Sequence, residues 1–269
     1  MLRGLYTATA GMLTQQKRTE MLSNNMANSN TPGYKADQSS IRAFPEMLLK
    51  RMDNNSVPAT VGTLNTGVYL QELNSQNIQG ELRETGLKSD VALIEQNVPF
   101  NEDTNVKGTL LFAVENQAGE ERYTKNGHFT LDENGTLLSD GNQVLSTTGQ
   151  TISIQSSNYQ ITADGDIFDV NGEFVAQIDV RFEDDVRNLV KEGNGLFRTV
   201  DEQALPTAIN NGAITYSLKQ NHLENSTVDV GRTYTDMMTA YRSFEANQKV
   251  LQAYDKSMDK AVNEIGRLR

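Results

Sequence analysis

The chain has 269 residues, of which 35 are acidic and 24 basic, so its net charge at neutral pH is −11. This balance argues against nucleic-acid binding, which requires Lys and Arg concentrated on one face. There is no cysteine, which excludes disulfides, thiolate metal sites and cysteine nucleophiles. No apolar run reaches the roughly 18 residues of a membrane-spanning helix, so we expect no membrane insertion.

Residues 1–30 are predicted to form an amphipathic helix, because large apolar residues recur at helical spacing. They are Leu2, Leu5, Tyr6, Met12, Leu13, Leu22 and Met26. Ala8 and Gly11 are small enough to let another helix approach closely. Pro32 disfavours helical backbone at Thr31 and should end the helix.

Residues 36–75 have a different composition, rich in Ser, Asn, Thr and Gln. They contain Pro45 and Pro58 and few apolar clusters. This composition is typical of an extended arm or linker.

Residues 76–224 read as β-structure. Asn-Gly and Asp-Gly pairs recur along this segment, and short alternating runs such as Phe174–Val180 lie between them. Tight glycine-containing turns between short strands indicate hairpins. We therefore predict an antiparallel β-domain that is barrel-like or sandwich-like.

Residues 230–269 are predicted to form a second amphipathic helix, with a heptad seam. Its positions are Val230, Tyr234, Met237, Tyr241, Phe244, Gln248, Leu251, Asp255, Met258, Val262 and Ile265. Such a helix either packs on its own domain or forms a hairpin or coiled coil with the N-terminal helix. We favour the second interpretation. Residues 1–35 and 225–269 then make one helical module in an α+β chain, with the β-domain inserted between them.

The sequence contains few residues in arrangements that are typical of catalytic or metal sites. There are only two histidines, His128 and His222, and no G-x-S-x-G motif accompanies them. The acidic turns at 132–135 and 164–166 lack the ligand spacing of an EF-hand. We predict no catalytic, cofactor-binding or metal site. A rival interpretation is a secreted β-domain enzyme or glycan-binding protein with a helical stalk, which predicts a pocket of converging titratable groups.

The two ends carry the most specific motifs. Residues 22–35 read LSNNMANSNTPGYK, and the C-terminal segment contains LENSTVDV at 223–230 and YRSFEANQK at 241–249. Together they resemble the signature of the bacterial flagellar rod and hook proteins. The matching positions include Asn24, Asn25, Asn28, Asn30, Thr31, Pro32, Gly33, Tyr34 and Asn247.

The resemblance implies a structural subunit of the flagellar basal-body rod in the cell envelope, most similar to distal rod proteins. A hook or hook-junction protein is the alternative. Paired terminal helices would build a helical axial tube that transmits torque from motor to hook, in contact with copies of the chain and other rod or hook proteins. The resemblance also implies passage through the flagellar type III export apparatus without a cleaved signal peptide. Phe44 and Leu48 look like the family's export-gate motif.

Three departures from the family pattern bear on the subtype. Tyr241-Arg242 stands where Gln-Arg is usual, and Gly195 stands where Asn is typical. Residues 95–100 replace a Gly-rich turn followed by two Phe residues, so we expect a remodelled hairpin there. These departures concern the position in the rod, not the family.

Overall fold

The computed structural model describes residues 3–51, 59–75, 77–156 and 158–263, without the side chains of 48–51, 59–61, 72 and 73. The chain divides into two compact units. The helical unit contains residues 1–27, 37–74 and 229–269, and the β unit contains residues 28–36 and 75–228. The chain therefore crosses from one unit to the other four times.

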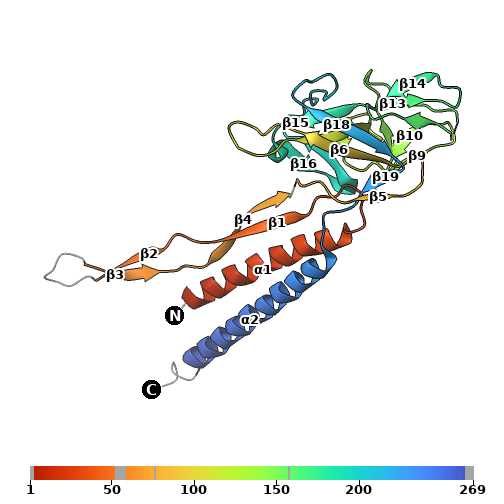
Figure 1. Ribbon diagram of the computed structural model, residues 1–269. Coiled ribbons are helices and arrows are strands. Elements are labelled where there is room, and N and C mark those ends of the chain that lie inside the picture. The colour runs from red at the N-terminus through yellow and green to blue at the C-terminus, as the bar shows by residue number, and fades with distance from the viewer. Residues whose placement is uncertain (1–2, 52–58, 76, 157, 264–269) are drawn as a thin grey trace. The chain divides into compact units, whose positions relative to one another are not determined.

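Two long helices form the frame of the helical unit. Helix α1 spans Arg3–Ala27 and helix α2 spans Val230–Asn263. They lie side by side and run in opposite directions (Figure 1). The Asp229 side chain begins α2, because its Oδ1 accepts a hydrogen bond of 3.0 Å from the Arg232 backbone N–H.

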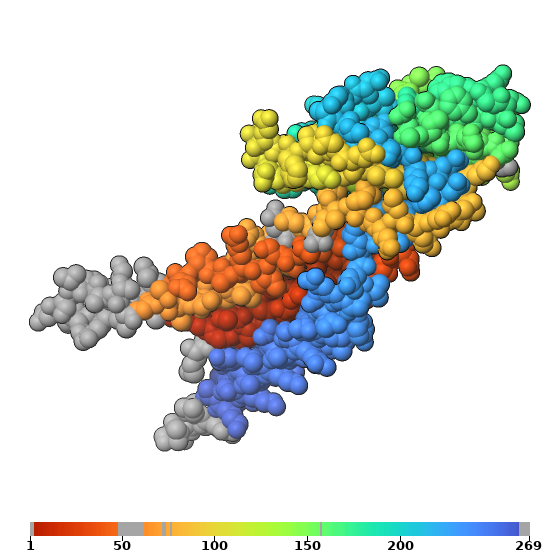
Figure 2. Space-filling view, in the orientation of Figure 1, coloured from red at the N-terminus to blue at the C-terminus, as the bar shows by residue number. Residues whose placement is uncertain are grey.

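Residues 37–74 add four strands to the helical unit. Strand β1 (Asp37–Ala43) pairs with β4 (Val68–Ser75), and β2 (Met47–Arg51) pairs antiparallel with β3 (Ala59–Leu64). Backbone pairing thus gives regular structure to a polar segment for which we predicted an extended arm. In Figure 2, α1 lies between these strands and α2.

The β unit is built around an eight-stranded sheet with seven strands in the order β16-β17-β8-β7-β11-β10-β9, while β15 pairs with β7. The strands are β7 (Thr109–Glu115), β8 (Glu121–Thr124), β9 (Phe129–Leu131), β10 (Leu137–Ser139), β11 (Asn142–Val144), β15 (Val180–Glu183), β16 (Leu189–Lys191) and β17 (Leu196–Thr199). Every neighbouring pair in this sheet is antiparallel.

Smaller sheets complete the β unit. They are β12-β13-β14, β18-β6 and β19-β5. Their strands are β5 (Leu82–Glu84), β6 (Val91–Asn97), β12 (Gln160–Ile161), β13 (Asp166–Phe168), β14 (Phe174–Gln177), β18 (Thr215–Gln220) and β19 (His222–Glu224). Two short 3-10 helices, η1 (Val186–Asn188) and η2 (Gly193–Gly195), flank β16.

The core lies on both faces of the central strand β7, which explains its nearly continuous run of apolar residues. Leu110, Phe112 and Val114 face the main cluster, while Leu111 and Ala113 face a smaller one. The α+β class is confirmed. The barrel-like expectation is wrong: in the described residues the main sheet is open, with β16 and β9 at its two ends. Turn signals predict hairpins but not sheet closure, which depends on long-range register.

Candidate assembly surface

The helices of the helical unit approach each other through small residues on α1. A Cβ added to Gly4 would collide with the Tyr254 side chain. Gly11 lies one heptad after Gly4 on α1, and Asn247 lies one heptad before Tyr254 on α2. A Cβ on Gly11 would lie 2.9 Å from the Asn247 Nδ2. Glycine therefore leaves the space that the larger α2 side chains fill.

A small apolar cluster joins the same helices nearer the C-terminal end of α1. Met21, Leu22 and Ala240 are buried together, and Met237 packs against them. The Arg18 Nη2 lies 3.4 Å from the Asp236 Oδ1 beside this cluster. Both side chains are partly exposed, so this ion pair contributes at most about 1 kcal/mol.

Most of α2 remains uncovered. Of the 34 residues of this helix only Thr233 and Ala240 are buried. A helix on a globular protein normally buries three to four residues in every two turns. The exposed large apolar side chains of the two helices are Tyr6, Leu13, Val230, Tyr234, Met238, Tyr241, Val250, Met258 and Val262.

The predicted self-assembly residues fall into two classes. Buried or half-buried ones are Leu5, Met12, Leu22, Met26, Met237, Phe244 and Leu251, and exposed ones are Tyr6, Leu13, Tyr241, Met258 and Val262. Leu2 and Ile265 lie outside the described residues. The predicted seam on α2 is therefore split between a face turned toward α1 and a face open to solvent.

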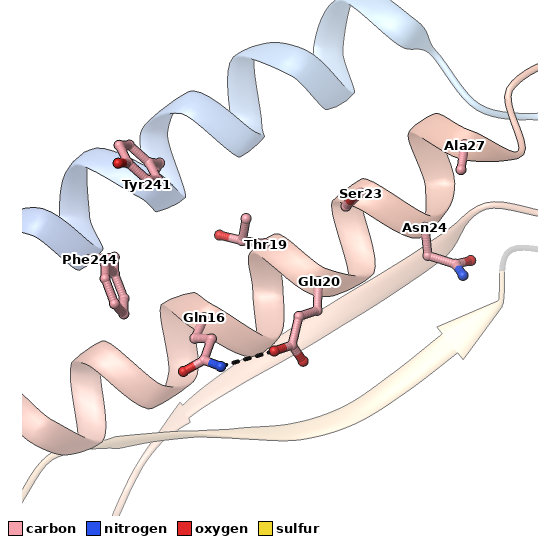
Figure 3. A pocket seen from close by; sticks show the side chains of 8 residues that line it. All are labelled: Gln16, Thr19, Glu20, Ser23, Asn24, Ala27, Tyr241 and Phe244. Atoms are coloured by element: carbon pink, nitrogen blue, oxygen red, sulfur yellow. Dashed lines mark hydrogen bonds between the residues drawn. The ribbon is translucent and has the colours of Figure 1, made fainter.

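An open groove of about 610 Å³ runs between the two helices on the exposed side. Phe244 points from α2 toward α1, while Tyr241 lies along α2 and lines the same groove (Figure 3). The α1 residues that line it are Gln16, Thr19, Glu20, Ser23, Asn24 and Ala27. The groove therefore has an aromatic wall and a mostly polar wall, with Gln16 Nε2 donating to Glu20 Oε1 at 3.1 Å.

The motif residue Asn25 connects α1 to strand β1. Its Nδ2 donates to the Asp37 backbone oxygen at 2.8 Å, and its Oδ1 accepts from the Asp37 backbone N–H at 3.0 Å. An amide side chain is suited to this task, because it donates and accepts at the same time. Asn25 is buried, so both bonds are shielded from water.

The two export-motif residues lie near the first strand pair. The Phe44 ring is 4.9 Å from the Tyr69 ring, and the Phe44 backbone N–H donates to the Gly67 oxygen at 3.0 Å. Phe44 is still 40% exposed. The backbone of Leu48 lies in β2, and its side chain is outside the described part of the structure.

Within the β unit, the N-terminal and C-terminal motifs lie side by side. The Gly33 backbone N–H donates to the Glu224 oxygen at 2.9 Å, and the Thr227 N–H donates to the Tyr34 oxygen at 3.0 Å. Thr227 Oγ1 also accepts from the Ala36 N–H at 2.9 Å. Gly33 has a φ of 70°, and a Cβ there would collide with the Lys125 carbonyl.

The other motif residues complete this turn. Asn28 Oδ1 accepts a hydrogen bond of 3.2 Å from the Thr31 hydroxyl, and the Asn28 backbone oxygen accepts from the Thr31 N–H at the same distance. The Lys191 ammonium lies 4.9 Å above the Tyr34 ring. Asn30 is exposed and Pro32 is half-buried.

A buried ion pair holds the joined motifs together. Lys35 Nζ donates to Glu224 Oε1 and to the Ile78 oxygen, the latter at 2.6 Å. The same Glu224 Oε1 accepts from the Gly80 N–H at 2.5 Å. Burial, reinforced by repulsion from Lys125, lowers the pKa of Lys35 to about 8 even though Glu224 opposes the shift. Breaking such a pair is costly because it leaves one charge buried alone.

Three regions of the chain match known families. Residues 5–35 match the family described as Flagella basal body rod protein. Residues 105–169 match Flagellar hook protein FlgE/F/G D1 domain. Residues 219–264 match Flagellar basal body rod FlgEFG protein C-terminal.

Full-length relatives agree with these matches. The flagellar hook-basal body complex protein FlhO of Bacillus subtilis (strain 168) is 52% identical over 272 residues, covering 100% of both chains. The chain belongs to the flagellar basal-body rod and hook protein family. The basal-body rod protein FlgG of the same strain is 29% identical and covers 98% of this chain and 99% of its own length. FlgF of Caulobacter vibrioides is 27% identical, and the similarity covers 98% of both chains.

Several titratable groups of this rod and hook family member form ion pairs beside a second hollow. A hollow of about 300 Å³ beside β8 and β17 brings Arg122 and Arg198 close to several glutamates. Arg122 Nε donates to Glu192 Oε2 at 2.9 Å, and Arg198 Nε lies 3.2 Å from the other Glu192 oxygen. The pair with Glu192 raises the pKa of Arg122. These groups neutralise one another, as in a structural ion-pair network.

The histidines are separated in the structure as well. His128 Nδ1 lies 2.6 Å from the buried Asp90 Oδ1, and His222 Nδ1 lies 3.0 Å from the Gln220 oxygen. Within the described residues, no group of three or more His, Asp or Glu side chains is placed to hold a metal ion. None of the described helices is long and apolar enough to cross a membrane.

Sequence reasoning missed the contacts made by Gly4, Tyr254, Lys35 and Glu224. A heptad of small residues on α1 was the available signal for the first two, because Gly4 and Gly11 are seven positions apart. For the ion pair there was no local signal, since its partners are 189 residues apart in the chain.

Proposed function

We propose that this chain is a structural subunit of the flagellar rod, in the distal part of the basal body. We also propose that the exposed apolar side chains of its helical unit become buried only against neighbouring subunits. In the assembled tube, copies of the chain and other rod or hook proteins surround each helix pair. The tube carries torque from the motor to the hook. The family membership established above supports the structural role.

The observation that carries this proposal is the incomplete burial of α2. Nine large apolar side chains are exposed on the two helices of a chain whose relatives include a flagellar hook-basal body complex protein. These side chains are 36–72% exposed, so covering each gains only part of the about 1.5–3 kcal/mol of full burial, and the nine contributions together favour association. A head-to-tail contact that does not close produces a helical tube.

The groove lined by Tyr241 and Phe244 is the proposed binding site for a neighbouring subunit. Exposed apolar residues one heptad apart recur on both helices, at Tyr6 and Leu13 and at Tyr234 and Tyr241. A row at this spacing suits insertion between two helices in a coiled-coil-like arrangement. We therefore propose that a helix from the next copy fills the groove.

The decisive test is Tyr241→Asp, because Tyr241 is 52% exposed and its loss leaves the core intact. We expect the variant to be exported and folded but to abolish motility and to disappear from purified basal bodies. Gln252→Asp is the matched control, since Gln252 is an exposed polar residue of the same helix. Normal motility with Tyr241→Asp contradicts the proposed surface.

The position along the axis needs a separate experiment. Electron microscopy of basal bodies from a strain carrying a tagged chain locates the subunit directly. Label on the distal rod supports the proposal. Label on the hook or its junction assigns the chain to the alternative branch of the same family.

Passage through the flagellar export apparatus is part of the proposal. Phe44 and Leu48 are the candidate recognition residues, and Phe44 is partly covered by Tyr69 in the folded chain. We expect Phe44→Ser to reduce the amount of chain exported, because the motif acts before folding. Ile41→Ser, three residues away and also exposed, is the control. Equal export of the two variants argues against the motif.

A further inference from the structure

We propose that Asn211 is the residue at which the folded chain deamidates spontaneously, so that ageing subunits gain a carboxylate at one defined place. The chain has five Asn-Gly pairs, the dipeptide in which the smallest possible side chain follows asparagine. They are Asn126-Gly127, Asn134-Gly135, Asn171-Gly172, Asn194-Gly195 and Asn211-Gly212. Their sequence is the same, so structure decides which of them reacts.

The reaction joins a backbone nitrogen to the preceding side chain. The Gly212 nitrogen loses its proton to solvent base and attacks the Asn211 Cγ. The new N–Cγ bond replaces the bond to Nδ2, and ammonia leaves. Water then opens the cyclic imide at one of its two carbonyls and gives aspartate or isoaspartate.

Asn211 meets the requirements of this reaction. Both Asn211 and Gly212 are exposed, and they border an open hollow of about 530 Å³ that admits water. In the part of the chain that the structure describes, the Gly212 N–H makes no hydrogen bond and is available to attack. The Ala213 N–H donates to Asn211 Oδ1 at 3.1 Å. This local side-chain to backbone bond folds the Asn211 amide over the backbone and polarises the carbonyl under attack.

The Asn126 side chain accepts the same kind of hydrogen bond, from the backbone N–H two residues on, but its amide is held by a second bond. Its Oδ1 accepts from the His128 N–H at 3.0 Å, and its Nδ2 donates to Asp140 Oδ2 at 2.8 Å. Only 5% of Asn126 is exposed, and Gly127 lies tightly against the Val91 carbonyl. Asn126 therefore reacts only when this region opens.

In two other pairs, Asn134-Gly135 and Asn171-Gly172, the glycine nitrogen is engaged in a hydrogen bond. The Gly135 N–H donates to the Asp132 oxygen at 3.0 Å, and the Gly172 N–H donates to the Asp169 oxygen at 3.1 Å. A nitrogen whose proton is donated in such a bond is less readily deprotonated, so it attacks more slowly. Asn194 and Gly195 are exposed too, but Asn194 lies inside the 3-10 helix η2 with a φ of 61°. In the described part of the chain no backbone N–H folds its side-chain amide over the backbone, as the Ala213 N–H does for Asn211.

Peptide mapping of the whole purified protein, incubated in mildly alkaline buffer, tests the proposal. We expect Asn211 to deamidate more than about tenfold faster than Asn126, which must first open locally. In denaturant the rates of the five pairs should converge, because only structure separates them. Faster reaction at any other pair in the folded protein, or the same ranking in denaturant, overturns the proposal.

Gly212→Ala is a variant that tests the chemistry without disturbing the fold. A Cβ at Gly212 meets nothing within 4 Å. The added methyl group hinders ring closure, so deamidation of Asn211 should slow about tenfold or more while the urea midpoint of unfolding stays unchanged. An unchanged rate at Asn211 contradicts attack by this nitrogen. Gly62→Ala, at a glycine of the helical unit that is similarly uncrowded and has no positive φ, is a control that should leave the rate at Asn211 unaltered.

Discussion

The two units of this rod and hook family member handle apolar residues in opposite ways. Of the 30 buried hydrophobic residues in the described chain, 26 belong to the β unit and four to the helical unit. Of the 18 exposed large hydrophobic residues, 12 belong to the helical unit and six to the β unit. The β unit is a finished domain, whereas the helical unit presents its apolar surface to solvent.

Charge follows the same division. The β unit carries 24 acidic and 11 basic residues, a net charge of −13, while the helical unit carries 11 acidic and 13 basic residues, a net charge of +2. High net charge favours solubility and opposes close association. The nearly neutral unit is thus the one suited to contact its copies, and the acidic unit keeps the free chain soluble.

The largest effect on stability is expected in the core of the β unit. Phe112 is completely buried and its ring lies 5.3 Å from that of Phe129. Phe112→Ala should cost about 3–5 kcal/mol, measured by urea unfolding. Phe174→Ala, at a 60% exposed position, should cost much less. Equal losses from the two variants would mean that the β unit is not the finished domain described here.

Acid should weaken the β unit next. Burial raises the pKa of Glu95, but its ion pairs with Lys125 and Lys107 outweigh burial and lower it to about 2. The folded pKa lies below the unfolded value, so the stabilisation is complete above pH ~4.5 and is lost as pH falls toward 2. The loss amounts to about 3 kcal/mol.

Denaturant titrations at several pH values measure this loss. Glu95→Gln has no carboxylate to protonate, so its stability should change less over the same pH range. The variant should also be less stable at neutral pH, because Lys125 remains buried without its partner. Parallel pH profiles for the two proteins would assign the acid sensitivity to other groups.

A smaller effect is expected at the contact between the helices. Gly11→Leu places a branched side chain where Asn247 lies. Overpacking of this kind costs about 1–3 kcal/mol, reduced here by the better helix propensity of Leu. Hydrogen exchange should show faster amide exchange along α2. Gln16→Leu, at an exposed position of α1, should leave the exchange unchanged.

The smallest effect on the stability of the free protein is expected at Tyr241, the residue whose substitution should disturb assembly most. Tyr241→Asp should change the free energy of unfolding by less than about 0.5 kcal/mol. Ala240→Asp, one position away but fully buried, should be strongly destabilising. If Tyr241→Asp unfolds the isolated chain, then its effect on motility says nothing about a subunit contact.

Much of the fold could be predicted from sequence periodicity. The two terminal helices, the antiparallel β-structure and the family were all foreseeable from apolar spacing, turn pairs and the end motifs. The buried face of α1 was foreseeable only in part. The small residues Ala8 and Gly11 indicate a close approach to another helix, but the stripe of large residues such as Leu5 and Met12 does not indicate that Thr14 is buried. Backbone proximity, not side-chain size, decides that face.

The remaining misses are long-range. The open sheet depends on which strands pair across the chain, for instance β15 with β7, and hairpin signals do not encode this. The ion pair of Lys35 with Glu224 joins residues from opposite ends. The motif positions could be identified in the sequence. The hydrogen bonds that join the N-terminal and C-terminal motifs within the β unit could not.

The fourfold crossing of the chain between its units has a mechanical consequence. A load applied to one unit reaches the other through four backbone connections, at 27–28, 36–37, 74–75 and 228–229. Cutting one connection with a protease leaves three intact, so a single nick does not separate the parts. Such redundancy protects the link between the two units against failure at any one peptide bond.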